Sequence, residues 1–131
     1  MASVIYLDTH VVTWLYAGRK DLLPAKVRQT IQECDIYISP IVRLELQYLY
    51  EIGRTKISAA KVIQALSGSV GLKLCGHPFA KVVEHAERQS WTRDPFDRII
   101  VAQAALDKSP LATKDRTIHA HYGMAMWADK P

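Results

Sequence analysis

The sequence predicts an α/β domain with a central, mainly parallel sheet of four or five strands, covered by helices on both faces. Short apolar runs rich in β-branched residues alternate along the chain with helical segments, an order typical of parallel α/β folds. Two helices begin with Ser or Asp followed by Pro, which is a strong start signal. No repeat or Pro/Gly/Ser-rich linker divides the 131 residues, so we expect one domain over residues 1–131.

In the first half of the chain, the leading strand stops abruptly at Asp8-Thr9. Ser39-Pro40 begins a later helix, which ends before Gly53 because glycine favours a helix stop. The elements expected up to this point are a strand at 4–7, helices at 11–17 and 24–32, a strand at 36–38 and a helix at 40–52.

The second half continues the alternation, and Asp94-Pro95 opens a long apolar helix that reaches about residue 107. The penultimate strand ends at Lys114-Asp115, much as the first strand ends at Asp8. The expected elements are helices at 58–66, 78–89 and 95–107 and strands at 72–75, 111–113 and 124–127.

The composition is that of a globular protein with a modest basic excess. Hydrophobic residues make up 49% and charged residues 23% of the chain, and 17 Lys and Arg against 13 Asp and Glu give a net charge of +4. Such an excess is compatible with a polyanionic partner. There is no long apolar stretch, and residues 1–7 lack the charged start of a secretory signal. We therefore expect no membrane segment and a cytoplasmic location.

The isolated cysteines and histidines predict no zinc site. Cys34 and Cys75 have no second Cys or His at the spacing of a metal site, and we interpret both as buried thiols. Four histidines are interpreted as ordinary residues, namely His77, His85, His119 and His121. Packing in the core or a dimer is the interpretation for Trp14, Trp91 and Trp127.

Asp8 and Asp115 each follow a buried strand. In open α/β sheets the ligand site lies beyond the carboxyl ends of the strands, so both acids are expected at that edge. Aspartate is also a preferred helix N-cap. Taken alone, either residue could therefore be only a cap or turn acid.

Glu45 occupies an unusual position on its predicted helix. Helical spacing places it among Ile41, Tyr48, Leu49 and Ile52, on the apolar face. A buried carboxylate without a partner costs several kcal/mol, roughly, so this group requires a cation, a basic partner or a raised pKa. The two interpretations are a salt bridge to a buried Arg and a metal site.

The motif Asp94-Pro95-Phe96-Asp97-Arg98 places two acids at a helix start. Asp94 as N-cap with Asp97 three residues later resembles a capping box, which would not prevent either carboxylate from binding a cation. Two carboxylates 4 Å apart repel by about 4 kcal/mol at an effective dielectric near 20, so a cluster of acids requires a divalent ion. Oxygen ligands indicate Mg²⁺ or Mn²⁺, and such an ion supports phosphodiester hydrolysis.

With these residues assembled, the sequence resembles the PIN-domain family, and most closely the VapC toxins of bacterial toxin-antitoxin pairs. The resemblance covers essentially the whole chain. It rests on four segments in order, which are Val4-Ile5-Tyr6-Leu7-Asp8-Thr9, Ser39-Pro40 leading to Leu44-Glu45-Leu46, residues 94–104, and Leu111-Ala112-Thr113-Lys114-Asp115.

This resemblance implies a PIN fold, metal-dependent endoribonuclease activity on RNA, a homodimer and inhibition by a cognate VapB-like antitoxin. The four family acids, which serve as catalytic and metal-binding residues, correspond to Asp8, Glu45, Asp97 and Asp115. Asp94 is an additional acid, and either it or Asp97 is the principal metal ligand of the motif. Three further positions are expected near the metal, its water or the RNA phosphate, namely Thr113, Arg98 and Lys114. The two basic residues could equally be solvated charges or partners of the acids.

Other functions stay open on the sequence alone. The chain could be a PIN nuclease that is not a toxin, or a binding-only PIN module that holds RNA or a protein without cleavage. A phosphoryl-accepting receiver domain also carries acids at strand ends. A receiver requires a pair of acids after the first strand, however, and Asp8 stands alone there.

Overall fold

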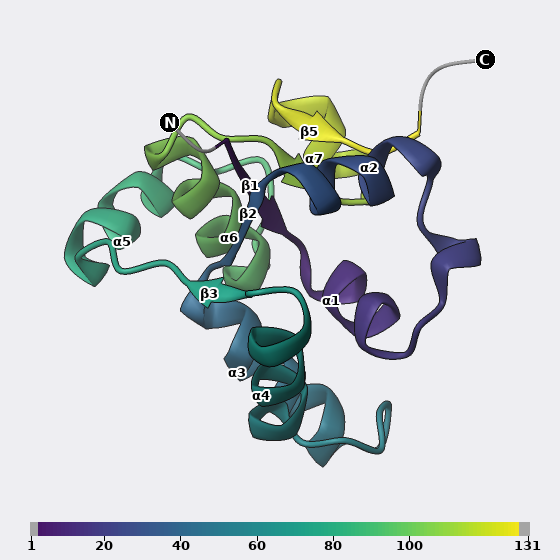
Figure 1. Ribbon diagram of the computed structural model, residues 1–131. Coiled ribbons are helices and arrows are strands. Elements are labelled where there is room, and N and C mark those ends of the chain that lie inside the picture. The colour runs from purple at the N-terminus through teal and green to yellow at the C-terminus, as the bar shows by residue number, and fades with distance from the viewer. Residues whose placement is uncertain (1–2, 129–131) are drawn as a thin grey trace.

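The computed structural model describes residues 3–128, in which helices surround a five-stranded sheet (Figure 1). The elements follow one another as β1 (Val4–Leu7), α1 (Thr9–Tyr16), a 3-10 helix (Lys20–Leu22), α2 (Ala25–Glu33), β2 (Asp35–Ile38), α3 (Pro40–Glu51), α4 (Ala59–Ser69), β3 (Lys73–Leu74), α5 (Phe79–Glu87), α6 (Pro95–Leu106), β4 (Leu111–Ala112), α7 (Arg116–His121) and β5 (Ala125–Met126). The α/β class is confirmed. All strand pairs of the described sheet are parallel.

The sheet has the strand order β3-β2-β1-β4-β5, so β1 is its central strand. The chain first builds outwards from β1 to β2 and β3, and later returns to place β4 on the other side of β1. A ligand crevice in such a sheet lies where the direction of building changes, at the carboxyl ends of the strands. Here that point lies between β1 and β4.

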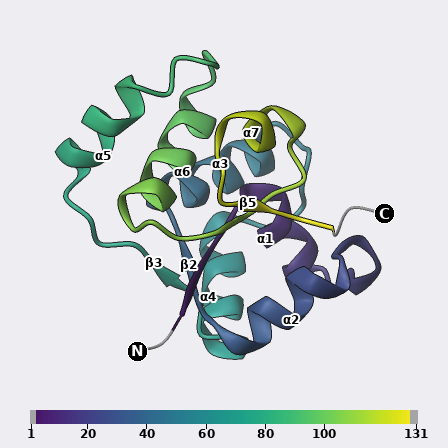
Figure 2. The same cartoon turned by 90° about the horizontal axis from the view of Figure 1, so that it is seen from above.

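Helices cover both faces of this sheet. α5 and α6 lie on one side, and α1 and α2 lie on the other (Figure 1), a separation that is also visible from above (Figure 2). α3 continues from β2 and packs against α4 and α6. Because every parallel crossover must pass over a face, both faces of the central strand are apolar.

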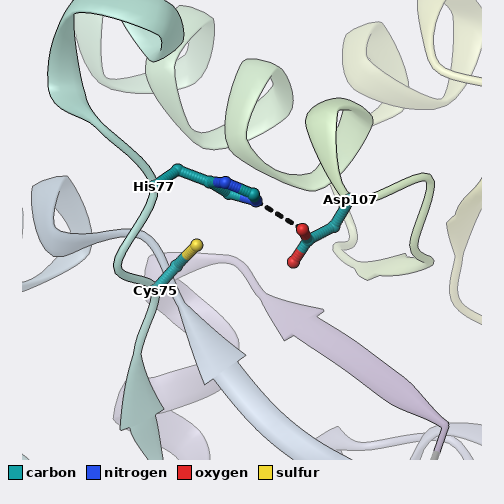
Figure 3. A group of neighbouring side chains, drawn as sticks. All are labelled: Cys75, His77 and Asp107. Atoms are coloured by element: carbon teal, nitrogen blue, oxygen red, sulfur yellow. Dashed lines mark hydrogen bonds and ion pairs between the residues drawn. The ribbon is translucent and has the colours of Figure 1, made fainter.

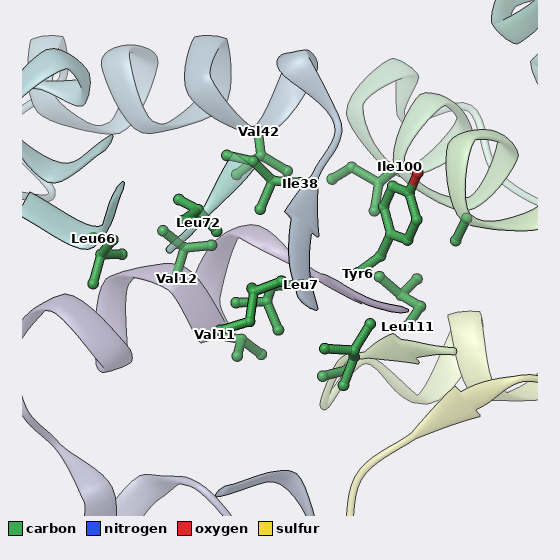
Figure 4. Close-up of a cluster of buried hydrophobic side chains, with 14 of the residues drawn as sticks. Tyr6, Leu7, Val11, Val12, Ile38, Val42, Leu66, Leu72, Ile100 and Leu111 are labelled. Atoms are coloured by element: carbon green, nitrogen blue, oxygen red, sulfur yellow. The ribbon is translucent and has the colours of Figure 1, made fainter. Parts of the chain in front are cut away.

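The main core lies around β1 (Figure 4). Ile5 and Leu7 are completely buried, and α1, β2, α3, α4, α6 and β4 each contribute buried side chains to the same cluster. Removing such a side chain from water contributes about 1.5–3 kcal/mol. The burial of Leu7 fixes the position of the next residue, Asp8.

The helix start predicted at Ser39-Pro40 is confirmed. The Ser39 hydroxyl accepts a hydrogen bond from the Ile41 N–H (3.3 Å), and Pro40 occupies the first helical position of α3. The same hydroxyl donates to the Gln103 side-chain oxygen (2.6 Å), and this bond is buried. Ser39 thereby ties the start of α3 to α6.

Several sequence predictions require correction. The strands predicted at 72–75, 111–113 and 124–127 contain two residues each, and α7 and the 3-10 helix were not predicted. β3 and β5 form the two edges of the sheet, where short strands are common, whereas the equally short β4 is a buried inner strand between β1 and β5.

Two predictions about burial were also wrong. α3 buries Val42 and Leu46, whereas Tyr48 and Ile52, predicted on its apolar face, are each 49% exposed. Cys75 is buried as expected, but Cys34 is only half-buried.

Over residues 3–128, none of the helices combines the length and the apolar character that crossing a bilayer requires.

Candidate metal centre

An acidic cavity of about 400 Å³ opens at the carboxyl edge of the sheet. It lies at the point between β1 and β4 where the strand order changes direction. We call this hollow the acidic cavity. Its lining residues are Asp8, His10, Trp14, Glu45, Asp94, Asp97, Lys114 and Asp115. All five acids predicted from the sequence are therefore brought together.

Asp8 is the innermost of these acids and is only 8% exposed. It is the N-cap of α1, because its Oδ1 accepts the Thr9 N–H (2.8 Å). Its Oδ2 accepts the hydroxyl of Thr113 (2.6 Å), which is completely buried. Burial raises the pKa of Asp8, and these two hydrogen bonds oppose that rise. The cap and the site role therefore coexist in one side chain.

Thr113 holds two of the acids in register. Besides donating to Asp8, its Oγ1 accepts the backbone N–H of Asp115 (3.1 Å). Asp115 in turn is the N-cap of α7, with its Oδ1 accepting the Ile118 N–H (3.0 Å). The end of β4 is thus joined to the end of β1 through one buried hydroxyl.

Glu45 reaches the cavity from α3 and is half-buried. One of its oxygens accepts the hydroxyl of Thr9, the residue after Asp8. Among residues 3–128 no ion pair involves Glu45, so the salt bridge to a buried Arg is not found. Burial raises the pKa of Glu45, and the charge of Asp8 adds to that rise.

Asp94 and Asp97 divide two roles at the start of α6. The Asp94 Oδ1 accepts the N–H groups of Phe96 (2.8 Å) and Asp97 (3.3 Å), so Asp94 is the N-cap. A full capping box does not form, because the Asp94 N–H donates to the Thr92 hydroxyl (3.2 Å) and not to Asp97. Within residues 3–128 no donor contacts the Asp97 carboxylate, so both of its oxygens are available to a ligand.

The electrostatics of the acidic cavity favour a bound cation. Burial and the charges of Asp94, Asp8, Asp115 and Glu45 together raise the pKa of Asp97 from 3.8 to about 7. These carboxylates repel one another, and a divalent ion would remove that repulsion.

The donor set fits a hard ion such as Mg²⁺ or Mn²⁺, since it consists of carboxylate oxygens. In the described part of the chain, no three of these acids bring oxygens within 4.8 Å of one another. Because Mg²⁺ keeps several of its waters, an ion in this cavity would bind one or two of the carboxylates directly and reach the others through water.

Of the two basic residues predicted beside the acids, the structure places one in the acidic cavity and the other outside it. Lys114 lines the acidic cavity. Arg98 does not, because its Nε donates to the Thr92 carbonyl (2.8 Å) and its side chain lines a hollow with Val83 and Ile99. Thr113 is buried and bonded to Asp8, so it positions an acid and has no surface with which to touch RNA.

Three residues of the cavity region were not found from the sequence. Thr9 bonds Glu45, while His10 and Trp14 line the cavity with their rings stacked 6.1 Å apart. All three lie in the first two turns after Asp8, and this proximity was the available signal. Trp14 does pack against the core as predicted, and it also lines the cavity.

Comparison with known proteins gives one family and one group of structures. The model of the PIN-domain family matches residues 5–123. No curated protein sequence matches the chain.

Among solved structures, the VapBC2 complex of Rickettsia felis bound to promoter DNA contains a similar chain, with 17% identity and a TM-score of 0.70 over 95% of this chain and 98% of that one. A toxin-antitoxin complex from Klebsiella pneumoniae is similar at 20% identity and a TM-score of 0.66, covering 93% and 95%. VapBC-1 from nontypeable Haemophilus influenzae is similar at 18% identity and a TM-score of 0.63, covering 96% and 97%. At these identities the likeness concerns the fold.

Proposed function

Because the family match spans residues 5–123, this chain belongs to the PIN-domain family, and we propose that it is a metal-dependent endoribonuclease acting as the toxin of a VapBC-type pair. The observation that carries the proposal is the acidic cavity, in which five carboxylates from four separate segments meet at the carboxyl edge of the sheet. A fold has no need to gather so many acids, since their repulsion destabilises it.

Asp8, Glu45 and Asp97 are the residues proposed to hold Mg²⁺ or Mn²⁺, with Asp115 and Asp94 at the rim. When bound, the ion would neutralise these acids, attract the scissile phosphate and supply Lewis acidity for its attack by water. Asp94 and Asp115 each commit one oxygen to a helix cap and keep the other for the cavity. Asp97, with two oxygens unbound among the described residues, is the better ligand of its pair.

The surrounding side chains orient the acids and the substrate. Thr113 fixes Asp8, and Thr9 fixes Glu45, so the carboxylates are positioned before a ligand arrives. Across residues 3–128, Lys114 is the one Lys or Arg lining the cavity, and it is proposed to contact an RNA phosphate. His10 stacked on Trp14 offers an aromatic surface at the same mouth.

The proposed protein partner is a small antitoxin. The proposed location of the complex is the cytoplasm. An apolar groove of about 340 Å³ adjoins the acidic cavity and shares Trp14 with it. Its other apolar lining residues include Tyr16, Leu46, Ile57 and Val62. An inhibitor with apolar side chains for the groove and a basic side chain for the acids would block both at once.

The binding-only alternative differs from the nuclease in one measurable respect. We propose incubating the purified chain with total RNA and, in parallel, single-stranded DNA, with Mg²⁺, with Mn²⁺ and with chelator, and then mapping the cut ends. Cleavage of RNA that stops with chelator and returns with metal is expected. RNA that binds and stays intact in the presence of metal would contradict the nuclease and favour a binding-only module.

A further inference from the structure

A second group of potential metal ligands lies away from the acidic cavity. Cys75, His77 and Asp107 come together although Asp107 is 30 residues from His77 (Figure 3). One ligand atom from each, a sulfur, a ring nitrogen and a carboxylate oxygen, lies within 4.8 Å of the other two. The sequence did not predict this group, because its third member comes from a distant helix end.

The backbone holds these residues in place. Cys75 continues the sheet beyond β3, since its N–H donates to the Ile38 carbonyl (2.8 Å). His77 follows two residues later in the connection to α5. Asp107 is the C-terminal cap residue of α6 and caps through its backbone N–H, which leaves its carboxylate available.

The Asp107 carboxylate already attracts the neighbouring polar groups. The buried Tyr6 hydroxyl donates to Oδ2, and His77 Nε2 contacts Oδ1. Burial and the bond to Asp107 raise the pKa of Tyr6, so this phenol stays a neutral donor. Cys75 is a buried member of the main core, and its thiol interacts with the Tyr6 hydroxyl, so the sulfur adjoins the network of Tyr6, His77 and Asp107.

The accessibility of the group suits an ion arriving from solvent. Cys75 is 8% exposed, whereas the side chains of His77 and Asp107 are 33% and 30% exposed. The sulfur is therefore sheltered, while the other two ligands face water. An ion bound here would keep an open position for a water molecule.

We propose that Cys75, His77 and Asp107 form a second metal site, specific for Zn²⁺ and distinct from the acidic cavity. A thiolate, an imidazole and a carboxylate are the ligands that Zn²⁺ uses, whereas Mg²⁺ does not bind thiolates. Tetrahedral zinc places its ligand atoms roughly 3.5 Å apart, so small side-chain rotations bring all three to the ion. Asp107 follows the 12 residues of α6 and Asp97 lies in its first turn, so the two sites lie at opposite ends of a helix about 18 Å long.

The zinc site would join segments that lie far apart in the sequence. It links the connection between β3 and α5 to the C-terminal end of α6, and Tyr6 of the central strand touches it. Its role is to brace α5 and α6 against the sheet. This proposal does not rest on nuclease activity.

Titration of the full chain with Zn²⁺, and with Co²⁺ as a spectroscopic substitute, tests the proposal. Binding of one equivalent, with a sulfur-to-cobalt charge-transfer band and a higher thermal midpoint, is expected for the wild type. Asp8→Asn, which alters only the acidic cavity, should keep the sulfur-to-cobalt band. Cys34→Ser is the matched control for the other thiol and should keep the band.

Cys75→Ser should lose the band, and His77→Gln should weaken Zn²⁺ binding by at least about tenfold. His77 is partly exposed, so its variant reports on the site even if Cys75→Ser does not fold. Circular dichroism checks each fold, and His85→Gln serves as the histidine control. Cobalt binding without a sulfur band, a band abolished by Cys34→Ser and kept by Cys75→Ser, or no binding at one equivalent would each overturn the site.

Discussion

Thr113 shows how one buried hydroxyl can organise a charged site. It donates to the Asp8 Oδ2 and accepts from the Asp115 N–H, so both of its hydrogen-bonding functions serve the acidic cavity. The bond to Asp8 joins residues 105 positions apart. Because the hydroxyl stabilises the ionised form of Asp8, it opposes the rise in pKa caused by burial. Thr113 is therefore a positioning residue.

Replacing Thr113 tests this role. Thr113→Val preserves the shape but leaves the Asp115 N–H and an Asp8 oxygen without a partner, which costs about 1–3 kcal/mol of unfolding free energy. RNA cleavage should fall by about 10–100-fold, and the Mg²⁺ concentration for half-maximal rate should rise. Rates across a Mg²⁺ titration, with urea unfolding curves, measure both effects. Thr113→Ser should keep the wild-type stability and the wild-type cleavage rate. A folded Thr113→Val chain that cleaves RNA at the wild-type rate would disprove the positioning role of Thr113.

Asp97 predicts a pH dependence of cleavage. Burial and the neighbouring acids raise its pKa to about 7, so below neutral pH the group is protonated and a poor metal ligand. At limiting Mg²⁺ the cleavage rate should therefore rise as the pH increases through 7, and saturating Mg²⁺ should move the midpoint to lower pH. A midpoint that does not respond to the metal concentration would contradict the assignment of Asp97 as a ligand.

The same shift makes a prediction about stability. The pKa of Asp97 is 3.8 in its unperturbed state and about 7 in the fold, so between these values the folded chain binds more protons than the unfolded chain. Without divalent metal, the free energy of unfolding should therefore fall as the pH rises through this window. Asp97→Asn should reduce that fall, and the exposed Asp35→Asn should leave it unchanged. Chemical unfolding in the presence of chelator at several pH values measures this pH dependence of the unfolding free energy.

At the scale of elements, helix starts position the acids. Asp8, Asp94 and Asp115 are the N-caps of α1, α6 and α7, so three cavity residues are set by the ends of helices. The starts of α1 and α6 were predictable, because an Asp that follows an apolar run or precedes Pro is a local signal for a helix start. α7 was missed because its six residues bury only Ile118 and carry no apolar periodicity.

Asp94 and Asp97 can be separated experimentally. Asp94→Ala removes the N-cap of α6 and should cost about 1 kcal/mol of stability, whereas Asp94→Ser keeps a cap oxygen and should cost much less. Asp97→Asn should be at least as stable as the wild type, because it relieves repulsion, and should lose most metal affinity. Unfolding curves measure the change in stability of each variant, and Mn²⁺ titration measures its loss of metal affinity. If Asp94→Ser lost more affinity than Asp97→Asn, Asp94 would be the principal ligand.

At the scale of the molecule, the strand order decides which acids meet. The sequence predicted that Asp8 and Asp115 end strands, but nothing local indicates that β4 lies beside β1. The position of Glu45 was only partly predictable. It does reach the cavity, but Tyr48 and Ile52, expected to share its buried face, remain exposed because α3 packs through Val42 and Leu46. Helical spacing fixes which residues share a face, while tertiary packing decides how far that face turns inwards.

The resemblance to VapC toxins implies a homodimer, and we propose that the exposed face of α3 forms its interface. Leu44, Tyr48 and Ile52 recur every four residues and are 56%, 49% and 49% exposed, so they form one apolar stripe. Light scattering should give twice the 14.8 kDa chain mass. Tyr48→Glu should shift the population to monomer, whereas Phe79→Glu, on α5, should not. A wild-type chain that is monomeric at high concentration would rule out the dimer.

The central claim is that the acidic cavity cuts RNA, and the most direct measurement compares the wild type with Asp8→Asn. Both are incubated with RNA and Mg²⁺ after circular dichroism and thermal unfolding have established that the variant is folded. We expect Asp8→Asn to lose at least about a hundredfold in cleavage rate, equivalent to roughly 2.7 kcal/mol of transition-state stabilisation. A folded Asp8→Asn chain that cleaves RNA at the wild-type rate would contradict the account.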